Sequence, residues 1–141
     1  RLLSRAWVAA ALAVAVAFLV PGARAYGQDV AIIQTEMVAA AEWIADHTEG
    51  DDLIAAHDIG AVGYFADRRL IDLAGLISPE VIPFLRDEAR LAEYLTAHEA
   101  DYLMTFPGWY PTLVEGRTPV FQTDASYSPA AGGENMAVYP W

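Results

Sequence analysis

The sequence contains no cysteine and no lysine among its 141 residues. Without cysteine the chain cannot form disulfide bonds or thiolate metal sites, and cysteine usage does not indicate whether it resides in an oxidising or a reducing compartment. All eight basic residues are therefore arginine. No cluster of potential ligands has the spacing of a metal site. We expect neither a metal nor a cofactor in this chain.

Positive charge is scarce over most of the chain. Arg1, Arg5 and Arg24 flank the apolar N-terminus, whereas all nineteen acids lie beyond residue 25. Residues 26–141 thus contain five arginines against nineteen acids, a net charge of −14. Such a surface repels nucleic acid and anionic lipid, so we expect no nucleic-acid partner. The acids first of all indicate a well-solvated exterior, because net charge governs solubility before function.

A long uncharged apolar run opens the chain. Ala6 to Val20 contains neither a charge nor a proline, and as a helix its fifteen residues span about 22 Å. A bilayer crossing needs about 20 residues, which the flanking residues can supply. Arg1 and Arg5 place the N-terminal end on the cytoplasmic side by the positive-inside rule. We therefore expect a membrane helix in residues 1–25 and one extracytoplasmic domain in residues 26–141.

The same apolar run has two interpretations. It fits a signal peptide, because arginines precede an apolar core and Ala23-Arg24-Ala25 has the small-x-small form of a cleavage site. It also fits the last transmembrane helix of a protein with earlier spans. The chain begins with Arg1 and not with methionine, which favours the second interpretation. In both cases the remaining residues lie outside the cytoplasm.

A compact strand–helix–strand unit is predicted at the centre of the chain. Leu53 to Ala56 and Leu70 to Leu73 are short apolar runs bounded by turn residues, as is typical of buried strands. Asp58 is expected to cap a short helix between them, in which Gly63 allows close contact with the sheet. The two strands are then parallel and aim Asp58 and Asp72 at the same edge.

Helical patterns lie on both sides of this unit. From Val30 to about Thr48 apolar residues recur at helical spacing, and Gly50 is expected to end that helix. Ser78-Pro79-Glu80 is typical of a helix start, and Asp87 can cap a further helix. His98 is expected to interact with the last carbonyls of that helix. Four polar residues fall outside the apolar stripe of the first helix: Gln34, Glu36, Glu42 and Asp46.

Three further strands complete the expected fold. Tyr102 to Phe106 is the third strand, and Thr118 to Thr123 and Met136 to Tyr139 are two more. Pro119 and Pro140 restrict the last two to edge or terminal positions, since proline cannot donate to a ladder. The sequence therefore predicts an N-terminal transmembrane helix and a small three-layer α/β domain, with a mostly parallel sheet and an antiparallel edge.

Polar and aromatic residues follow three of the predicted strands. Ligands bind outside the carboxyl ends of parallel strands, and the sequence places His57 and Asp58, then Asp72, then Trp109 and Tyr110 at these ends. Carboxylates beside exposed aromatic rings suit a sugar, which offers hydroxyls for hydrogen bonds and an apolar ring face for packing. These five residues are our candidates for ligand or interdomain contacts.

Each candidate also has a structural alternative. Asp58 can cap a helix, Asp72 can organise a turn, and the two aromatic residues can pack on the membrane or a partner domain. The two carboxylates could act as an acid and a base, although the sequence fixes neither their separation nor a shifted pKa. His57 and Asp58 form no catalytic triad, because adjacent strand residues point to opposite faces and no serine elbow accompanies them.

The stretch IAAHDIGAVGYFADRRLIDLAGLISPEVIPFLRD, followed by YLMTFPGWYP, resembles a known kind of domain. It is similar to the extracytoplasmic C-terminal domain of polytopic membrane glycosyltransferases, such as protein mannosyltransferases and arabinose-transferase-like enzymes, which take sugars from polyprenyl-phosphate carriers. The resemblance covers about Ala31 to Pro111. It implies that the preceding helix is the last transmembrane span. It also implies that the domain sits over a membrane-embedded active site and shapes the acceptor route.

The resemblance assigns no catalytic residue to this chain, because the catalytic acid of such enzymes lies in an external loop near the start of the membrane region. The implied partners are the membrane, the upstream transmembrane region of the same protein, and a glycan or lipid-linked sugar. The alternative is a secreted or membrane-anchored α/β module that binds a carbohydrate or a protein. A third hypothesis, stand-alone hydrolysis by Asp58 and Asp72, depends on a geometry that the sequence does not define.

Overall fold

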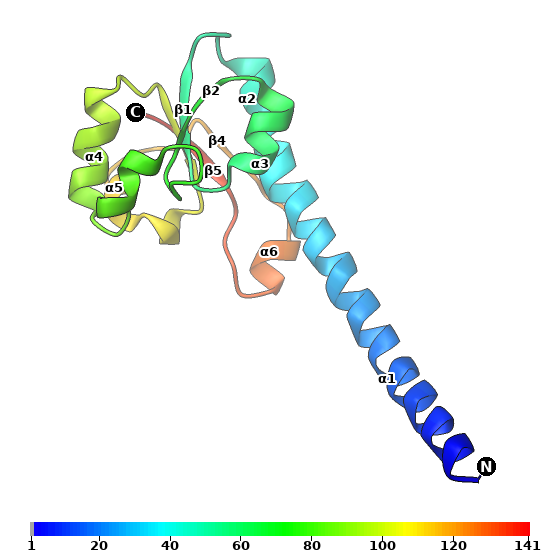
Figure 1. Ribbon diagram of the computed structural model, residues 1–141. Helices are drawn as coiled ribbons and strands as arrows, with labels where there is room; N and C mark the ends of the chain where they lie inside the picture. Colours follow the sequence, from blue (N-terminus) through cyan, green and yellow to red (C-terminus); the bar gives the residue numbers. More distant parts are fainter. Residues whose placement is uncertain (1) are drawn as a thin grey trace.

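A single helical rod runs from Leu2 to His47 and ends on a mixed α/β domain (Figure 1). The computed structural model describes residues 2–141. In the rod, α1 (Leu2–Ile33), a π-helical turn η1 (Gln34–Val38) and α2 (Ala39–His47) follow one another without a break. The helix from Leu3 to His47 is long and apolar enough to cross a membrane. It continues past residue 25, so no change of secondary structure marks the predicted domain boundary.

The domain is built on a five-stranded sheet. Its strands lie in the order β2-β1-β3-β5-β4. The first three are parallel to one another, whereas β5 is antiparallel to both β3 and β4. The antiparallel edge therefore contains two strands. The bounds are β1 (Leu53–Ala56), β2 (Arg69–Asp72), β3 (Tyr102–Thr105), β4 (Phe121–Gln122) and β5 (Ala137–Pro140).

Short helical segments connect the strands. A helix α3 and a π-helical turn η2 join β1 to β2, and a 3-10 helix η3 and the longer α4 join β2 to β3. The segments η4, α5 and α6 follow β3. Their bounds are α3 (Ile59–Ala61), η2 (Val62–Ala66), η3 (Pro79–Phe84), α4 (Glu88–Ala97), η4 (Pro107–Trp109), α5 (Pro111–Val114) and α6 (Tyr127–Ala130).

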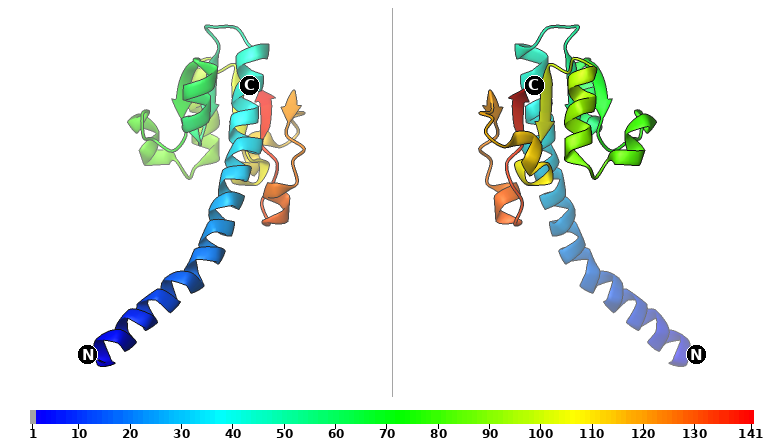
Figure 2. Two further views of the ribbon diagram at one scale, coloured as in Figure 1. Left: turned by 90° about the vertical axis from the view of Figure 1, so that its right-hand side faces the viewer. Right: turned by 90° about the vertical axis from the view of Figure 1, so that its left-hand side faces the viewer.

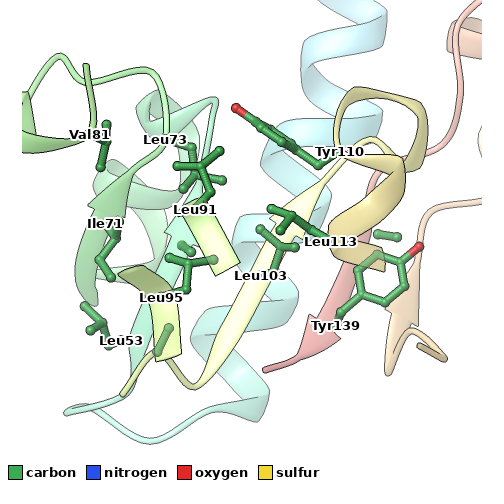
Figure 3. Packing of buried hydrophobic residues seen from close by; sticks show 13 residues of the cluster. Leu53, Ile71, Leu73, Val81, Leu91, Leu95, Leu103, Tyr110, Leu113 and Tyr139 are labelled. Atoms are coloured by element: carbon green, nitrogen blue, oxygen red, sulfur yellow. The ribbon is translucent and has the colours of Figure 1, made fainter. Parts of the chain in front are cut away.

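Two apolar clusters, one on each face of the sheet, make the domain three-layered. Alternate residues of β1 point to opposite faces, as the strand geometry requires. Leu53 and Ala55 pack in the cluster that α4 and α5 cover, which Figure 3 shows from close by. Ile54 and Ala56 pack in the other cluster, against α2 and η2. All four residues of β1 are buried, so this strand forms the centre of the core.

Two local predictions are wrong in detail. Gly50 does not end the helix, because α2 stops at His47 and Thr48 is already extended. Arg68 instead binds the end of α2 and donates to the carbonyl oxygens of Ala45 and Thr48, both at 2.9 Å. Asp58 holds the N-cap position of α3 but makes no capping hydrogen bond with its side chain.

Three other local predictions are confirmed. The Asp87 carboxylate accepts the backbone N–H of Arg90 at 3.1 Å and so caps α4. At the other end of α4, His98 Nδ1 lies 2.8 Å from the carbonyl oxygen of Tyr94. A Cβ added to Gly63 would lie 3.3 Å from Leu70 Cδ1, so glycine does allow a close approach to β2.

The rod fixes the orientation of the sheet. After α2 ends at His47, the chain turns within a few residues and β1 runs back along the rod. The carboxyl ends of the parallel strands β1, β2 and β3 therefore face the side on which the N-terminal part of α1 leaves the domain. Figure 2 shows the antiparallel β5 (red) pointing the opposite way, away from the N-terminus.

Candidate functional site

The carboxyl ends of β1 and β3 form the switch point of this sheet. From β1 the chain passes to β2 on one side, and β3 then pairs with the other side of β1. In open α/β sheets, ligands bind in the crevice that such a reversal opens outside the carboxyl ends of the strands. The loop after β1 carries His57 and Asp58, and the loop after β3 carries Trp109 and Tyr110.

Three of the predicted residues meet at this point. His57 Nδ1 lies 2.8 Å from the Tyr110 hydroxyl oxygen. The Trp109 ring meets the imidazole edge-on, with ring centroids 5.0 Å apart and an interplanar angle of 76°. Trp109 is 48% exposed, whereas Tyr110 is 6% exposed. The site therefore has an exposed indole wall and a largely covered phenol, joined through one imidazole.

These residues line a hollow of about 410 Å³, which we call the switch-point cleft. The other lining residues, Leu85, Arg86 and Glu88, come from the connection between β2 and β3. Arg86 and Glu88 were not among the residues predicted from the sequence, because they are far from the strand ends along the chain. Glu88 Oε2 accepts the backbone N–H groups of Thr112 and Leu113 at 2.7 and 3.0 Å, which joins α4 to α5 below the cleft.

The Tyr110 hydroxyl stays protonated over the physiological pH range. Burial raises the pKa of Tyr110 to about 12, with further contributions from the carboxylates of Asp72, Glu88 and Asp58. The phenol can donate a hydrogen bond to His57 Nδ1 or accept one from it, so the pair brings hydrogen-bonding groups to the cleft.

Asp72 has the structural role that the sequence left open. Its side chain is fully buried. Oδ1 accepts the backbone N–H of Ala74 at 2.8 Å, and Oδ2 accepts that of Ile77 at 2.9 Å. The carboxylate is thus engaged in the loop after β2 and has no surface for a ligand. The turn role is thus the one that the structure shows for Asp72, whereas the side chain of Asp58 is partly exposed.

A second hollow lies on the other side of Trp109. Its volume is about 470 Å³, and the rod forms one of its walls through Ile32 and Met37. Glu134 lines it and accepts the backbone N–H of Gly108 at 2.5 Å. Trp109 borders both hollows, and the rod contributes to the lining of the second one. This hollow was not predicted from the sequence, because its walls come from distant parts of the chain.

A buried carboxylate fastens the rod to the domain. Glu36, in the π-helical turn, is fully buried. It accepts hydrogen bonds from the Thr123 hydroxyl, from Asn135 Nδ2 at 3.1 Å and from the Met136 backbone N–H at 2.8 Å. Over residues 2–141 no group of three His, Asp or Glu side chains has a geometry that could hold a metal ion. Glu36 is therefore a structural anchor and has no metal-binding partners in the described chain.

The chain belongs to the family described as a domain of unknown function (DUF8728), which matches residues 24–139. The match includes the upper part of the rod, every strand residue of the sheet except Pro140, and every residue of the switch-point cleft. A comparison with curated proteins finds no significant match.

Proposed function

We propose that this chain is the C-terminal part of an integral-membrane glycosyltransferase that moves a sugar from a lipid-phosphate carrier to an extracytoplasmic acceptor. The chain's domain then holds or guides the acceptor, and the chemistry takes place in the upstream transmembrane region. The observation that supports this most is the position of the switch-point cleft. It opens at the carboxyl ends of β1 and β3, on the side where α1 leaves toward the membrane.

The cleft residues suit a saccharide. An exposed indole provides a surface for the apolar face of a sugar ring, and Trp109 supplies it. His57 and Tyr110 offer hydrogen-bonding groups beside it, and Arg86 and Glu88 also line the cleft. A few polar groups around an aromatic wall are what a small-ligand site needs.

The same residues argue for binding rather than catalysis by this domain. Acid–base transfer needs two groups that both reach the substrate. The Asp72 carboxylate is buried and hydrogen-bonded within its loop, so that of the two predicted carboxylates only Asp58 retains exposed surface. An accessory role for the domain agrees with this geometry and with the sequence resemblance described above.

The test uses the full-length membrane protein, reconstituted with radiolabelled polyprenyl-phosphate sugars and extracytoplasmic acceptors. Trp109→Ala should lower transfer about tenfold at limiting acceptor, equivalent to about 1.4 kcal/mol of lost acceptor binding. Tyr64→Ala is the matched control, because Tyr64 is an aromatic side chain that is 80% exposed outside the cleft. Unfolding temperatures should stay equal in both variants. Unchanged transfer by Trp109→Ala would contradict the acceptor role, and no transfer from any lipid donor would contradict the enzyme class.

The alternative is a membrane-anchored module that binds a carbohydrate on its own. It is favoured by one observation, that all the residues lining the switch-point cleft belong to this chain. A glycan array probed with the detergent-solubilised full chain separates the two functions. Glycan binding that Trp109→Ala abolishes, without transfer activity in the parent protein, would establish the module.

A further inference from the structure

Three aliphatic side chains project from the segment that follows β2. Leu76 is 79% exposed, Ile77 is 58% exposed and Ile82 is 53% exposed. Their surroundings differ from the rest of the acidic domain, since residues 73–86 include only Glu80 and Arg86 as charged residues. We call Leu76, Ile77 and Ile82 the aliphatic patch. A contiguous exposed apolar patch commonly marks a site of protein or membrane contact.

The loop that presents the aliphatic patch has a defined shape. The buried Asp72 carboxylate holds the backbone N–H groups of Ala74 and Ile77, and the Asp72 N–H donates to Ser78 Oγ at 3.1 Å. Gly75 has a φ of +80°, which favours glycine. A Cβ at this position would lie 2.7 Å from Ile82 Cγ1. These contacts define the turn that holds Leu76 and Ile77 toward solvent.

The aliphatic patch lies on the membrane side of the domain. The loop follows β2, so it is at the carboxyl edge of the sheet, which faces the part of the rod that is long and apolar enough to cross a membrane. The large apolar side chains of that part of the rod, such as Trp7, Leu12 and Phe18, are exposed in the chain by itself. The aliphatic patch and the exposed surface of α1 thus face the same apolar environment.

We infer that the aliphatic patch docks on the surface of the bilayer that α1 crosses, and that its occupant is zwitterionic lipid. The strongly acidic domain disfavours anionic headgroups, because residues 26–141 contain nineteen acids against five arginines. Aliphatic side chains gain from leaving water for the headgroup and acyl boundary. The domain then touches the membrane at two places, the rod and the patch, which fixes the height of the switch-point cleft above the lipid. This inference depends on the membrane span and not on the glycosyltransferase activity.

The absence of cysteine makes a direct test possible. Single variants Leu76→Cys, Ile77→Cys and Ile82→Cys of the full chain are labelled with a nitroxide and placed in phosphatidylcholine nanodiscs. Val14→Cys, on the apolar part of α1, reports the bilayer interior, and Asp51→Cys, in the exposed turn before β1, reports water at the opposite edge of the domain. Power-saturation spectroscopy then compares the accessibility of each label to oxygen and to a water-soluble nickel chelate.

Docking predicts that the oxygen-to-nickel ratio at positions 76 and 77 is several-fold higher than at position 51 and lower than at position 14. A ratio equal to that at position 51 would overturn the inference. Labels shielded from both oxygen and nickel would also overturn it, because protein rather than lipid would then cover the patch. Each labelled variant is used only if its thermal unfolding matches that of the unsubstituted chain, and position 82 serves as the independent third reporter.

Discussion

The Nδ1 atom of His57 lies 2.8 Å from the hydroxyl oxygen of Tyr110, a residue 53 positions further along the chain. This contact joins the loop after β1 to the loop after β3 across the switch point of the sheet. Trp109 packs against the same imidazole and leaves about half of its own surface exposed. The bond therefore positions the exposed indole indirectly, because it fixes the ring on which the indole rests.

Tyr110→Phe should alter the alkaline stability of the domain. The pKa of Tyr110 is raised to about 12 in the folded protein, from an ordinary value of 10.0. A raised pKa means that its contribution to stability is fully present below about pH 10 and is lost as the pH rises through about 12. Denaturant unfolding across this range should show a shallower loss of stability in Tyr110→Phe. Tyr64→Phe, which removes an exposed hydroxyl, is the control, and equal slopes in the two variants would contradict the assignment.

Glu36→Gln should destabilise the joint between the rod and the domain. The carboxylate of Glu36 accepts three hydrogen bonds while fully buried, and the amide nitrogen of glutamine would face donors with a donor of its own. We expect a loss of about 1–3 kcal/mol in the free energy of unfolding. Urea unfolding followed by circular dichroism measures it. Glu42→Gln changes an exposed carboxylate of the same rod and should cost much less; equal losses would show that Glu36 is not an anchor.

Arg68→Ala should loosen the end of α2. The guanidinium donates to Thr48 Oγ1 and to the carbonyl oxygens of Ala45, Thr48 and Ala66. Losing these charge-assisted bonds should lower the free energy of unfolding by about 1–3 kcal/mol. Arg68→Lys should recover little of that loss, because the ammonium group lacks the planar, forked donors of the guanidinium. The neighbouring exposed Arg69→Ala provides the control by the same unfolding measurement. Full rescue by Arg68→Lys would mean that charge alone matters at this position.

Gly75→Ala and Gly60→Ala should have effects of opposite sign. Alanine at Gly75 would have to adopt a φ of +80° with its Cβ 2.7 Å from Ile82, which we expect to cost about 1–3 kcal/mol. Gly60 lies in α3, where an added Cβ meets no atom within 4 Å. Alanine there should stabilise the domain by about 0.5–1 kcal/mol. Thermal unfolding of the two variants decides, and a stable Gly75→Ala protein would mean that the loop after β2 can rearrange.

The sheet was largely predictable because its signals are local. The apolar run Leu53–Ala56 is bounded by turn residues and matches β1 residue for residue. Strand Thr118–Thr123 was overestimated, since only Phe121 and Gln122 form β4. Pro119 has no N–H with which to extend the ladder. On either side of β4, the backbone N–H groups of Val120 and Thr123 donate to the carbonyl oxygens of Val138 and Met136.

The site was predictable only where it depends on strand ends. His57, Trp109 and Tyr110 came together because parallel strands deliver their loops to one edge. The burial of Glu36 was not predictable from helical spacing, which placed it outside the apolar stripe. Its partners lie 87 to 100 positions away, and the π-helical turn changes the helical phase at this point.

The uninterrupted helix from Leu3 to His47, 45 residues or about 67 Å at 1.5 Å per residue, connects the apolar N-terminal segment to the domain that contains the cleft. With Glu36 and Arg68 fixing its upper part, the domain does not hang from a flexible tether. If α1 crosses a bilayer as proposed, a change of bilayer thickness that tilts the helix by about 10° shifts a point about 30 Å along the rod by about 5 Å. Under that proposal the thickness of the membrane is one of the variables that control what the cleft can reach.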